Sequence, residues 1–287
     1  MCVLDRLLRA SGVAGAEPPR PSASAIDAKD AAAGGGTNAG AAALPDPDFV
    51  PLPGVTHAWR GRRPNGLEGA IVHYDAGRTR PVGRPDDPEW GARNTLAGAQ
   101  AQGFAFATIS RTGRIYLPAN MDWEAWGYHA GESRCPATGR TSVSRFYVGF
   151  ELNSPGLLYP TGDADLFIPW FEAARDGQGN PLLDAQGRAR PAKAGGESWR
   201  RAEVRLVPAK TGNIKPGAYA PCTPAQQAAL TGVLLWLKAR YPNSFRLDRV
   251  FGHDEVAPTR KADPGASLGE GDAAMTMAAF RERLKDL

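Results

Sequence analysis

Short apolar runs, separated by polar and Gly-containing stretches, recur through most of the chain and predict a succession of strands and helices. Strands are predicted at residues 67–74, 104–110, 114–117, 146–153 and 249–252. The second and third strands are joined by RTGR at 111–114, a sequence typical of a Gly-containing hairpin turn.

Helices are predicted between and after these strands, one of them at 90–102. Another begins after Thr223, with Thr as N-cap, Pro at the first position and Gln226 reaching back, and Pro242 ends it. A last helix is expected to begin at Asp272 and to run to the end of the chain. Alternating strands and helices predict an α/β fold, with a mixed central β-sheet flanked by α-helices.

The strand at 147–153 has two unlike faces, because successive side chains of a strand point in opposite directions. One face carries Val148, Phe150 and Leu152 and is expected to join the core. The other carries Gly149, Glu151 and Asn153. The small residue beside Glu151 leaves room for a substrate on this polar face.

Residues 1–45 differ in composition from the rest of the chain. The part from residue 11 onward is rich in Ala, Gly, Pro and Ser, so it cannot bury enough apolar surface to offset its ordering entropy. We expect 1–45 to be a flexible arm and linker, whose first residues are either a frayed terminus or a docking peptide for a partner. Residues 46–287 are the expected catalytic domain, with an irregular, elaborated insertion at about 154–220.

Composition excludes some functions and leaves others open. The chain has 287 residues, 42% of them hydrophobic, and a formal net charge of +4, which is too small to identify a partner. No basic run is interleaved with aromatic residues, so nucleic-acid binding is not expected. No apolar run approaches the roughly 20 residues of a membrane-spanning helix. Asp5, Arg6 and Arg9 interrupt the apolar N-terminal stretch, so no secretory signal peptide is expected.

The three cysteines are far apart and show no CxxC spacing, which argues against a cysteine metal site. A disulfide bridge between Cys135 and Cys222 is possible if the protein reaches an oxidising compartment.

Two of the four histidines end predicted strands, where a side chain projects from the edge of a sheet. They are His73 and His253, and Asp263 follows the second by ten residues through a loop containing Pro and Gly. Two imidazoles and one carboxylate leave a fourth tetrahedral position open, as in catalytic zinc sites. His57 precedes the first of these strands in a loop and is expected at the surface.

The segment around His253, GHDEVAPTRKADPG at 252–265, resembles the GHxDIAPGRKxDPG signature of the amidase-2 family. These are N-acetylmuramoyl-L-alanine amidases related to the peptidoglycan recognition proteins. Three further segments resemble family motifs in the same order: IVHY at 71–74, WGYHAGES at 126–133 and VGFELN at 148–153. RTGRIY at 111–116 is similar to the family's DGxIY, so the resemblance covers about residues 68–265.

This resemblance implies zinc ligands at His73, His253 and Asp263, with catalytic roles for Glu151 and Lys261. The implied reaction is hydrolysis of the amide between the muramic acid lactyl group and L-alanine, with one zinc ion per chain. Zinc would lower the pKa of its water to roughly 7. Glu151 would pass the water's proton to the leaving amine, and zinc and Lys261 would stabilise the oxyanion.

Substrate contacts are expected at four further residues of these motifs: His129, Tyr74, Trp126 and Asn153. The family usually has WHAG where this chain has WGYHAG, so a tyrosine is inserted beside His129. This histidine is expected to line the cleft or to support a ligand, with a purely structural role as the alternative.

Rival functions are a peptidoglycan receptor without catalysis and a cysteine peptidase using Cys135, six residues from His129. The partner in every case is bacterial peptidoglycan or its muropeptides. The expected location is synthesis in the cytoplasm, followed by delivery to periplasmic peptidoglycan by a route other than the general secretory one. A phage lysin or a secreted antibacterial effector fits the N-terminal arm better than a cytosolic recycling enzyme does.

Overall fold

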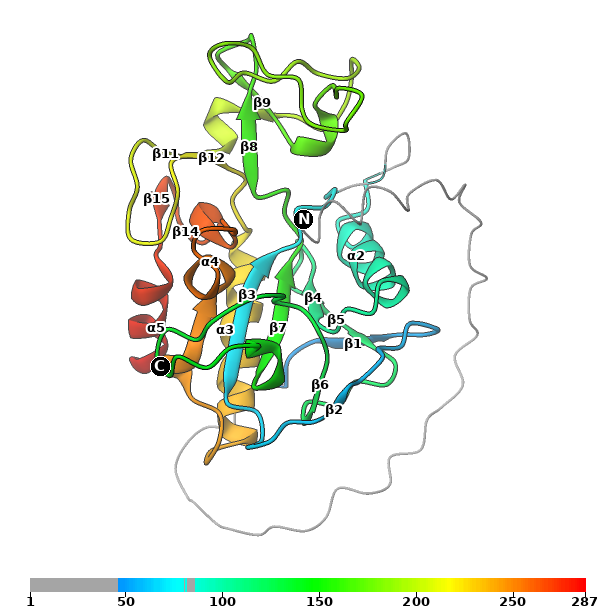
Figure 1. Cartoon of the computed structure of the whole chain (residues 1–287), viewed down its shortest axis with the longest axis vertical. Coiled ribbons are helices and arrows are strands. Elements are labelled where there is room, and N and C mark those ends of the chain that lie inside the picture. The colour runs from blue at the N-terminus through cyan, green and yellow to red at the C-terminus, as the bar shows by residue number, and fades with distance from the viewer. Residues whose placement is uncertain (1–45, 80, 82–85) are drawn as a thin grey trace. The chain divides into compact units, whose positions relative to one another are not determined.

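A six-stranded mixed sheet forms the centre of the protein in this computed structural model, which describes residues 46–79, 81 and 86–287 (Figure 1). The predicted arm, 1–45, lies outside the described residues. In order across the sheet, the strands are β1 (Phe49–Leu52), β5 (Ile115–Pro118), β4 (Ala107–Ile109), β7 (Tyr147–Leu152), β3 (Gly69–Tyr74) and β13 (Val250–Gly252). The predicted mixed sheet is confirmed.

Four neighbouring strands of this sheet, β4, β7, β3 and β13, run parallel. Their carboxyl ends therefore meet at a single edge, which in open α/β sheets is where sites form. In the register of β3 with β7, His73 lies opposite Glu151. The fold thus brings together two residues that the sequence separates by 78 positions.

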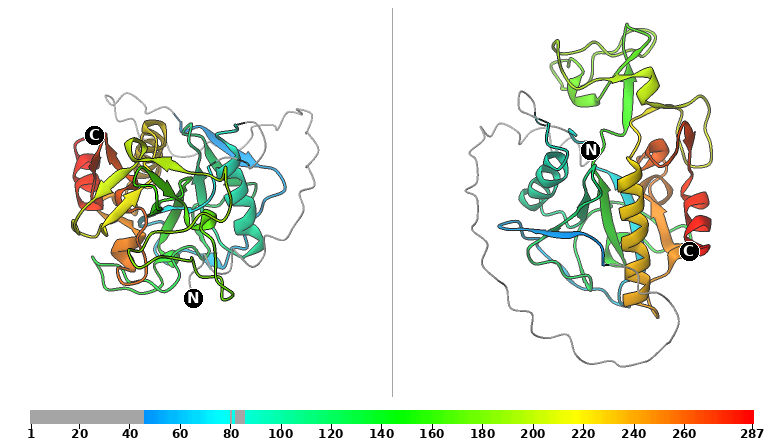
Figure 2. Two further views of the ribbon diagram at one scale, coloured as in Figure 1. Left: turned by 90° about the horizontal axis from the view of Figure 1, so that it is seen from above. Right: turned by 180° about the vertical axis from the view of Figure 1, so that it is seen from behind.

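Two long helices cover different faces of the sheet: α2 (Trp90–Ala101) and α3 (Pro224–Arg240). Figure 2 shows α3 lying lengthwise against the strands, and its Leu230 and Leu234 pack on Phe150 of β7. Thr223 and Gln226 form the predicted capping box. Helix α2 packs on the opposite face, over β4 and β5.

The predicted final helix starts later than expected. Thr276, rather than Asp272, caps α5 (Met277–Lys285), and its hydroxyl accepts a hydrogen bond from the backbone NH of Ala279. Asp272 instead lies in the turn of the hairpin β14 (Gly269–Glu270) and β15 (Ala273–Ala274). Both residues are good N-caps, and only the pairing of these strands decides between them.

The insertion at about 154–220 is more regular than its sequence suggests. It forms a second sheet, in the order β10 (Trp199–Arg200), β9 (Leu166–Ile168), β8 (Leu157–Pro160), β12 (Gly217–Tyr219) and β11 (Arg205–Val207). These strands are too short to show a periodic pattern. Figure 1 shows β8 and β9 beyond the carboxyl ends of the central strands, so the insertion stands over the edge where His73 and Glu151 lie.

Glycine makes one junction between the insertion and the central sheet. Gly156 has φ +67°, and a Cβ there would lie 2.3 Å from the ring of Tyr74. Tyr74 therefore packs directly against the chain entering β8, and a larger residue at 156 would separate the two.

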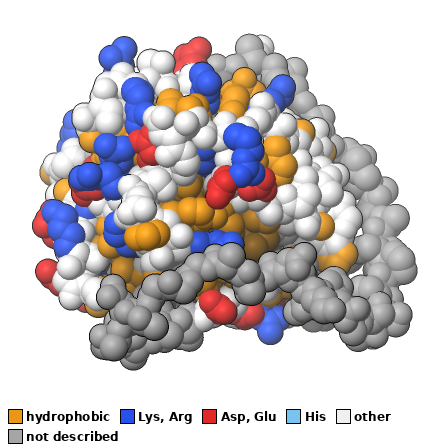
Figure 3. Space-filling view, turned by 90° about the horizontal axis from the view of Figure 1, so that it is seen from below, with side chains coloured by type: hydrophobic (Ala, Val, Ile, Leu, Met, Phe, Trp, Pro, Cys, Tyr) orange, Lys and Arg blue, Asp and Glu red, His pale blue; other side chains and the backbone are white. Residues whose placement is uncertain are grey.

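The opposite end of β3 is held by ion pairs. Glu68 is buried and pairs with Arg140 and Arg249. Figure 3 views the molecule from this end, where acidic and basic side chains lie beside one another. The ion pairs tie three distant segments together at the base of the sheet.

Two expectations about single residues are corrected or resolved. His57 is buried, with 4% of its surface exposed, and packs against Trp59 and Phe106, so its predicted surface position is wrong. Cys135 and Cys222 are both free and are buried in separate clusters, so the disulfide bridge that the sequence allowed does not form. None of the helices in the described ranges is long and apolar enough to cross a membrane.

Candidate metal centre and active site

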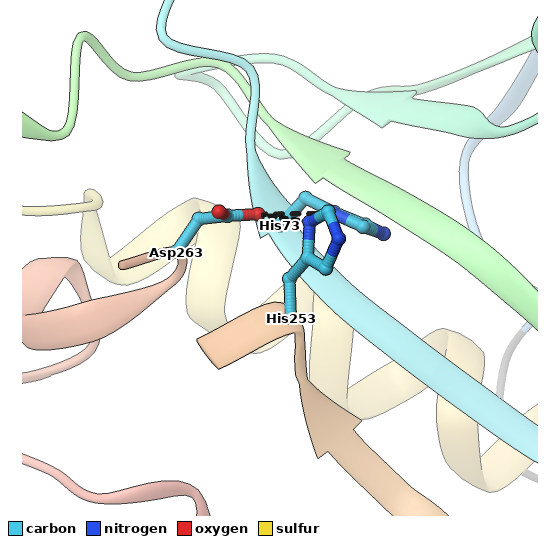
Figure 4. A group of neighbouring side chains, drawn as sticks. All are labelled: His73, His253 and Asp263. Carbon is cyan, nitrogen blue, oxygen red and sulfur yellow. Dashed lines mark hydrogen bonds and ion pairs between the residues drawn. The ribbon is translucent and has the colours of Figure 1, made fainter. Parts of the chain in front are cut away.

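Three predicted ligands converge at the carboxyl edge of the sheet (Figure 4). His73 belongs to β3, His253 begins the short helix α4 (His253–Val256) after β13, and Asp263 lies in the following loop. Oδ2 of Asp263 lies 3.0 Å from Nδ1 of His73 and 2.9 Å from Nδ1 of His253. The two Nδ1 atoms are 2.9 Å apart.

The outer nitrogen of each imidazole has a partner within the protein. Nε2 of His253 donates to the carbonyl of Ala130 at 3.0 Å. Nε2 of His73 lies 3.3 Å from Nδ1 of His129, whose own Nε2 donates to the carbonyl of Tyr147 at 2.8 Å. These acceptors assign a proton to Nε2 of all three imidazoles.

With these tautomers, three unprotonated acceptor atoms face one another. They are Nδ1 of His73, Nδ1 of His253 and Oδ2 of Asp263, with all ligand atoms of the group within 4.8 Å of one another. Acceptors at this spacing repel unless a cation lies between them. Donors held tetrahedrally at 2.0–2.2 Å from zinc would be about 3.3–3.6 Å apart, slightly wider than observed, so the set fits this ion after a small outward movement.

Burial and neighbouring charge keep the group in its ligand form. Burial and the nearby His253 lower the pKa of His73 to about 4, so its imidazole is neutral at pH 7. Although burial raises it, the pKa of Asp263 lies well below its usual range, so this carboxyl group is ionised at pH 7. Neutral imidazoles and an ionised carboxylate are the forms that bind metal.

The loop bearing Asp263 is fixed from two sides. The backbone NH of Asp254 donates to the carbonyl of Asp263 at 2.8 Å. From the insertion, the buried guanidinium of Arg205 donates to the carbonyls of Ala266 and Ser267 at 2.6 and 3.2 Å, and to that of Gly271 at 2.9 Å. The insertion therefore helps to hold a predicted ligand in place.

Glu151 lies beside the three ligands without joining them. Its Oε1 is 3.9 Å from Nδ1 of His73, and its Oε2 is buried without a hydrogen-bond partner among the described residues. Burial, and then the charges of Asp263 and Asp75, raise the pKa of Glu151 well above its usual range. The charge of Lys261 opposes this shift, so its ammonium lies near the same carboxylate.

The four predicted substrate contacts have different surroundings. His129 is buried behind His73, with its ring against Gly149. Trp126 belongs to β6 (Ala125–Trp126), which pairs with β2 (Gly61–Arg62), and its ring contacts that of Tyr128.

The other two predicted contacts, Tyr74 and Asn153, serve packing and internal hydrogen bonding. Tyr74 packs against the start of the insertion. Asn153 is 0% exposed, so the structure gives no support to direct substrate binding by this side chain.

Asp75, which sequence reasoning missed, explains the burial of Asn153. Its carboxylate accepts hydrogen bonds from Nδ2 of Asn153, the backbone NH groups of Ser154 and Gly77, and the hydroxyl of Thr95. It thereby ties the end of β3 to the end of β7, two residues beyond His73 and Glu151. Its position directly after the IVHY motif at 71–74 was the sequence feature that could have identified it.

The segment after Asp75 is clamped by the insertion. Nε1 of Trp170 donates to the carbonyl of Ala76 at 2.8 Å, and Ala76 has φ +52°, which is strained for a residue with a side chain. Arg78 forms an ion pair with the buried Glu172, and the hydroxyl of Thr79 donates to Glu197 at 3.0 Å. The insertion thus holds the segment that follows β3, next to the candidate site.

Several solved structures are similar to this chain. A selenomethionine derivative of AmpD is 21% identical and covers 83% of this chain and 94% of its own, with a TM-score of 0.41. AmiD from E. coli, bound to an anhydro-muropeptide, is 18% identical over 74% of this chain and 58% of its own (TM-score 0.40). The endolysin LysCS from Clostridium intestinale is 11% identical over 85% of this chain and 99% of its own (TM-score 0.39).

No curated protein matches the chain. The sequence profile described as N-acetylmuramoyl-L-alanine amidase, in contrast, matches residues 62–266. That range is well over half of the 287 residues and contains all three converging ligands and Glu151. The chain therefore belongs to the amidase-2 family of N-acetylmuramoyl-L-alanine amidases.

Proposed function

We propose that this amidase binds one zinc ion through His73, His253 and Asp263, and that it hydrolyses the muramoyl–L-alanine amide of peptidoglycan. Metal binding is supported by three unprotonated acceptor atoms that lie 2.9–3.0 Å apart. Two imidazoles and one carboxylate are a typical donor set of catalytic zinc sites. The folded region 46–287 carries every residue of the proposal.

When bound, zinc supplies Lewis-acid chemistry: it lowers the pKa of water to about 7 and polarises a carbonyl group. Glu151 then acts as general base and acid. Its Oε2, which has no hydrogen-bond partner among the described residues, accepts a proton from the attacking water, and the same carboxyl group returns it to the departing amine of L-alanine. Burial and the neighbouring carboxylates raise the pKa of Glu151, so its carboxylate is a stronger base than that of an exposed glutamate.

Lys261 supplies positive charge close to the reacting amide. Its side chain is mostly buried and lies near enough to His73 and Glu151 to shift the pKa of both. A fixed ammonium in a dry site stabilises the negative charge that develops on the carbonyl oxygen.

His129 acts in this proposal by holding His73 in its metal-binding tautomer. Its Nδ1 accepts from Nε2 of His73 while its Nε2 is held by the carbonyl of Tyr147. Such outer partners commonly orient metal-binding imidazoles. The rival role for Cys135 in a peptidase has no support, because this thiol is buried against the hydroxyl of Tyr147.

The biological setting that we propose is lysis of bacterial cell walls, by a phage lysin or a secreted antibacterial effector. Product analysis tests the reaction itself. Purified sacculi are digested, and mass spectrometry identifies the released material. Intact stem peptides with a free L-alanine amino terminus are expected. Binding of muropeptide without any release would favour the receptor alternative.

A further inference from the structure

A cavity of about 460 Å³ lies at the same edge of the central sheet as the candidate site. It is lined by Thr79 and Asp86–Pro88, by Arg111 in the turn between β4 and β5, and by Glu197, Trp199 and Glu203 of the insertion. Arg111 follows β4 by two residues, and Ile109 of β4 pairs with Leu152 of β7, next to Glu151. The cavity is therefore a neighbour of the candidate site on the side of β4.

Two hydrogen-bond donors of this cavity lack acceptors within the described part of the chain. They are Nη1 of Arg111 and Nε1 of Trp199, and both atoms are buried. The guanidinium of Arg111 lies over the ring of Trp199, 5.5 Å from its centroid. The two donors thus lie close together in the lining of the cavity.

Two arginines that are buried as whole residues show how unusual this unpaired nitrogen of Arg111 is. Arg63 donates to the carbonyls of Trp123, Ser144 and Tyr147, and Arg205 likewise donates only to carbonyls. Buried donors are nearly always paired, because an unpaired one costs about 1–3 kcal/mol. Burial also lowers the pKa of Arg111, although the nearby Glu197 and Asp75 oppose this shift.

Four carboxylates line the cavity, those of Asp86, Asp87, Glu197 and Glu203, and each has a partner within the protein. Asp87 pairs with Arg93 and accepts from the backbone NH of Glu89. Glu197 accepts from Thr79, and Glu203 accepts from the backbone NH of Arg200 at 2.6 Å. The groups that still need a partner are donors, and a planar guanidinium beside an indole NH suits a carboxylate.

We propose that this cavity binds a carboxylate of the peptide stem, with Arg111 and Trp199 donating to it. The inference rests on the proposed amidase function and extends it to substrate selection. A muropeptide stem carries free carboxylates at its γ-linked glutamate and at its C-terminus, whereas neutral sugars offer only hydroxyl and amide groups. The site is preorganised, because the hydroxyl of Thr223 donates to the carbonyl of Arg111 at 2.7 Å and anchors its backbone to α3.

Three synthetic muramoyl tripeptides test this inference: one with both carboxylates free, one amidated at the glutamate and one amidated at the C-terminus. Wild-type protein should show kcat/KM roughly 10- to 100-fold lower for one amidated compound, the loss expected for a charge-assisted hydrogen bond. That compound identifies which carboxylate is bound.

Variants then assign the effect to the cavity. Arg111→Met should hydrolyse all three compounds with the low kcat/KM that wild type shows for its less favoured amidated compound. Arg111→Lys should recover part of the discrimination. Trp199→Phe keeps an aromatic ring, removes the NH and should lose a smaller part of the discrimination. Arg188→Met is the matched control, since Arg188 is exposed in a turn of the insertion and pairs with Asp184. It should behave as wild type.

Equal turnover of the three compounds by wild type, with Arg111→Met unchanged, would overturn this inference and leave the amidase function standing. Hydrolysis of none of them would instead contradict the amidase function. Calorimetric binding of the same compounds would then still test the cavity, because the preference for free carboxylate and its loss in Arg111→Met do not require turnover. Thermal melting of each variant shows that it is folded.

Discussion

Nε2 of His73 lies 3.3 Å from Nδ1 of His129, and this contact orders the protons of the candidate metal centre. His129 is held by the carbonyl of Tyr147, so its Nδ1 is an acceptor. His73 must then carry its proton on Nε2, which leaves Nδ1 as a metal ligand. A residue outside the ligand set therefore decides which nitrogen of His73 faces the other ligands.

Replacing His129 by Leu should weaken zinc binding by about 10- to 100-fold while the protein stays folded, because His73 loses the partner that fixes its tautomer. Competition with a chromophoric chelator measures the affinity. His129→Gln can still offer an acceptor to His73, so its zinc affinity should lie between those of wild type and His129→Leu. Wild-type affinity in the Leu variant would show that His129 does not position His73.

Arg205→Met should destabilise the metal-free protein by at least about 2 kcal/mol, since three buried carbonyls lose their donor. Zinc affinity should fall as well, because the loop bearing Asp263 loses its support from the insertion. Urea unfolding and chelator competition measure the two effects. An unchanged zinc affinity would mean that the insertion braces the fold without supporting the metal centre.

The ion pairs of Glu68 should make stability depend on pH. Burial raises the pKa of Glu68, but hydrogen bonds from Arg140 and Asn65 outweigh it and leave the pKa below its usual value. A carboxyl group whose pKa is lower in the folded state contributes stability above its unfolded pKa, near 4.3. That contribution to stability is lost as the pH falls through the lower pKa that Glu68 has in the folded protein.

Glu68→Gln should therefore cost about 3 kcal/mol at pH 7, the loss expected on breaking a buried ion pair. The difference from wild type should shrink below about pH 4. Urea unfolding at pH 7 and pH 3 measures it. Asp248→Asn is the control, because Asp248 pairs with Arg246 at an exposed position, and it should cost less than about 1 kcal/mol. A pH-independent cost for Glu68→Gln would contradict this account.

Glu151→Gln should reduce turnover by roughly 10²- to 10⁴-fold, the usual contribution of a positioned proton-transfer group. Zinc content should not change, because Glu151 lies outside the ligand set. Release of L-alanine amino termini from peptidoglycan measures turnover, and elemental analysis measures zinc. Near wild-type turnover in this variant would remove Glu151 from the mechanism.

The sequence predicted five of the six strands of the central sheet, because each carries a clear local apolar pattern, but it missed β1. His73 and His253 end apolar runs, and parallel strands place such ends side by side. The capping box of Thr223 was equally readable, because its bonds span only three residues.

Contacts between distant segments could not be predicted from local sequence patterns. Arg205 looks like a solvated charge in a polar stretch, and only the fold places carbonyls around it. His57 looked like a loop residue, yet Phe106 and Trp59 enclose it. Asp272 and Thr276 were equally good helix caps until the pairing of β14 with β15 decided between them.

Zinc titration of metal-free protein tests the central claim most directly. The proposal predicts that one zinc ion binds per chain and that hydrolysis of muropeptides rises in proportion to occupancy. His73→Ala should lose zinc and hydrolysis together, while the structure away from β3 should persist by circular dichroism. Full hydrolysis in protein shown by elemental analysis to be free of metal, or undiminished zinc binding by His73→Ala, would contradict it.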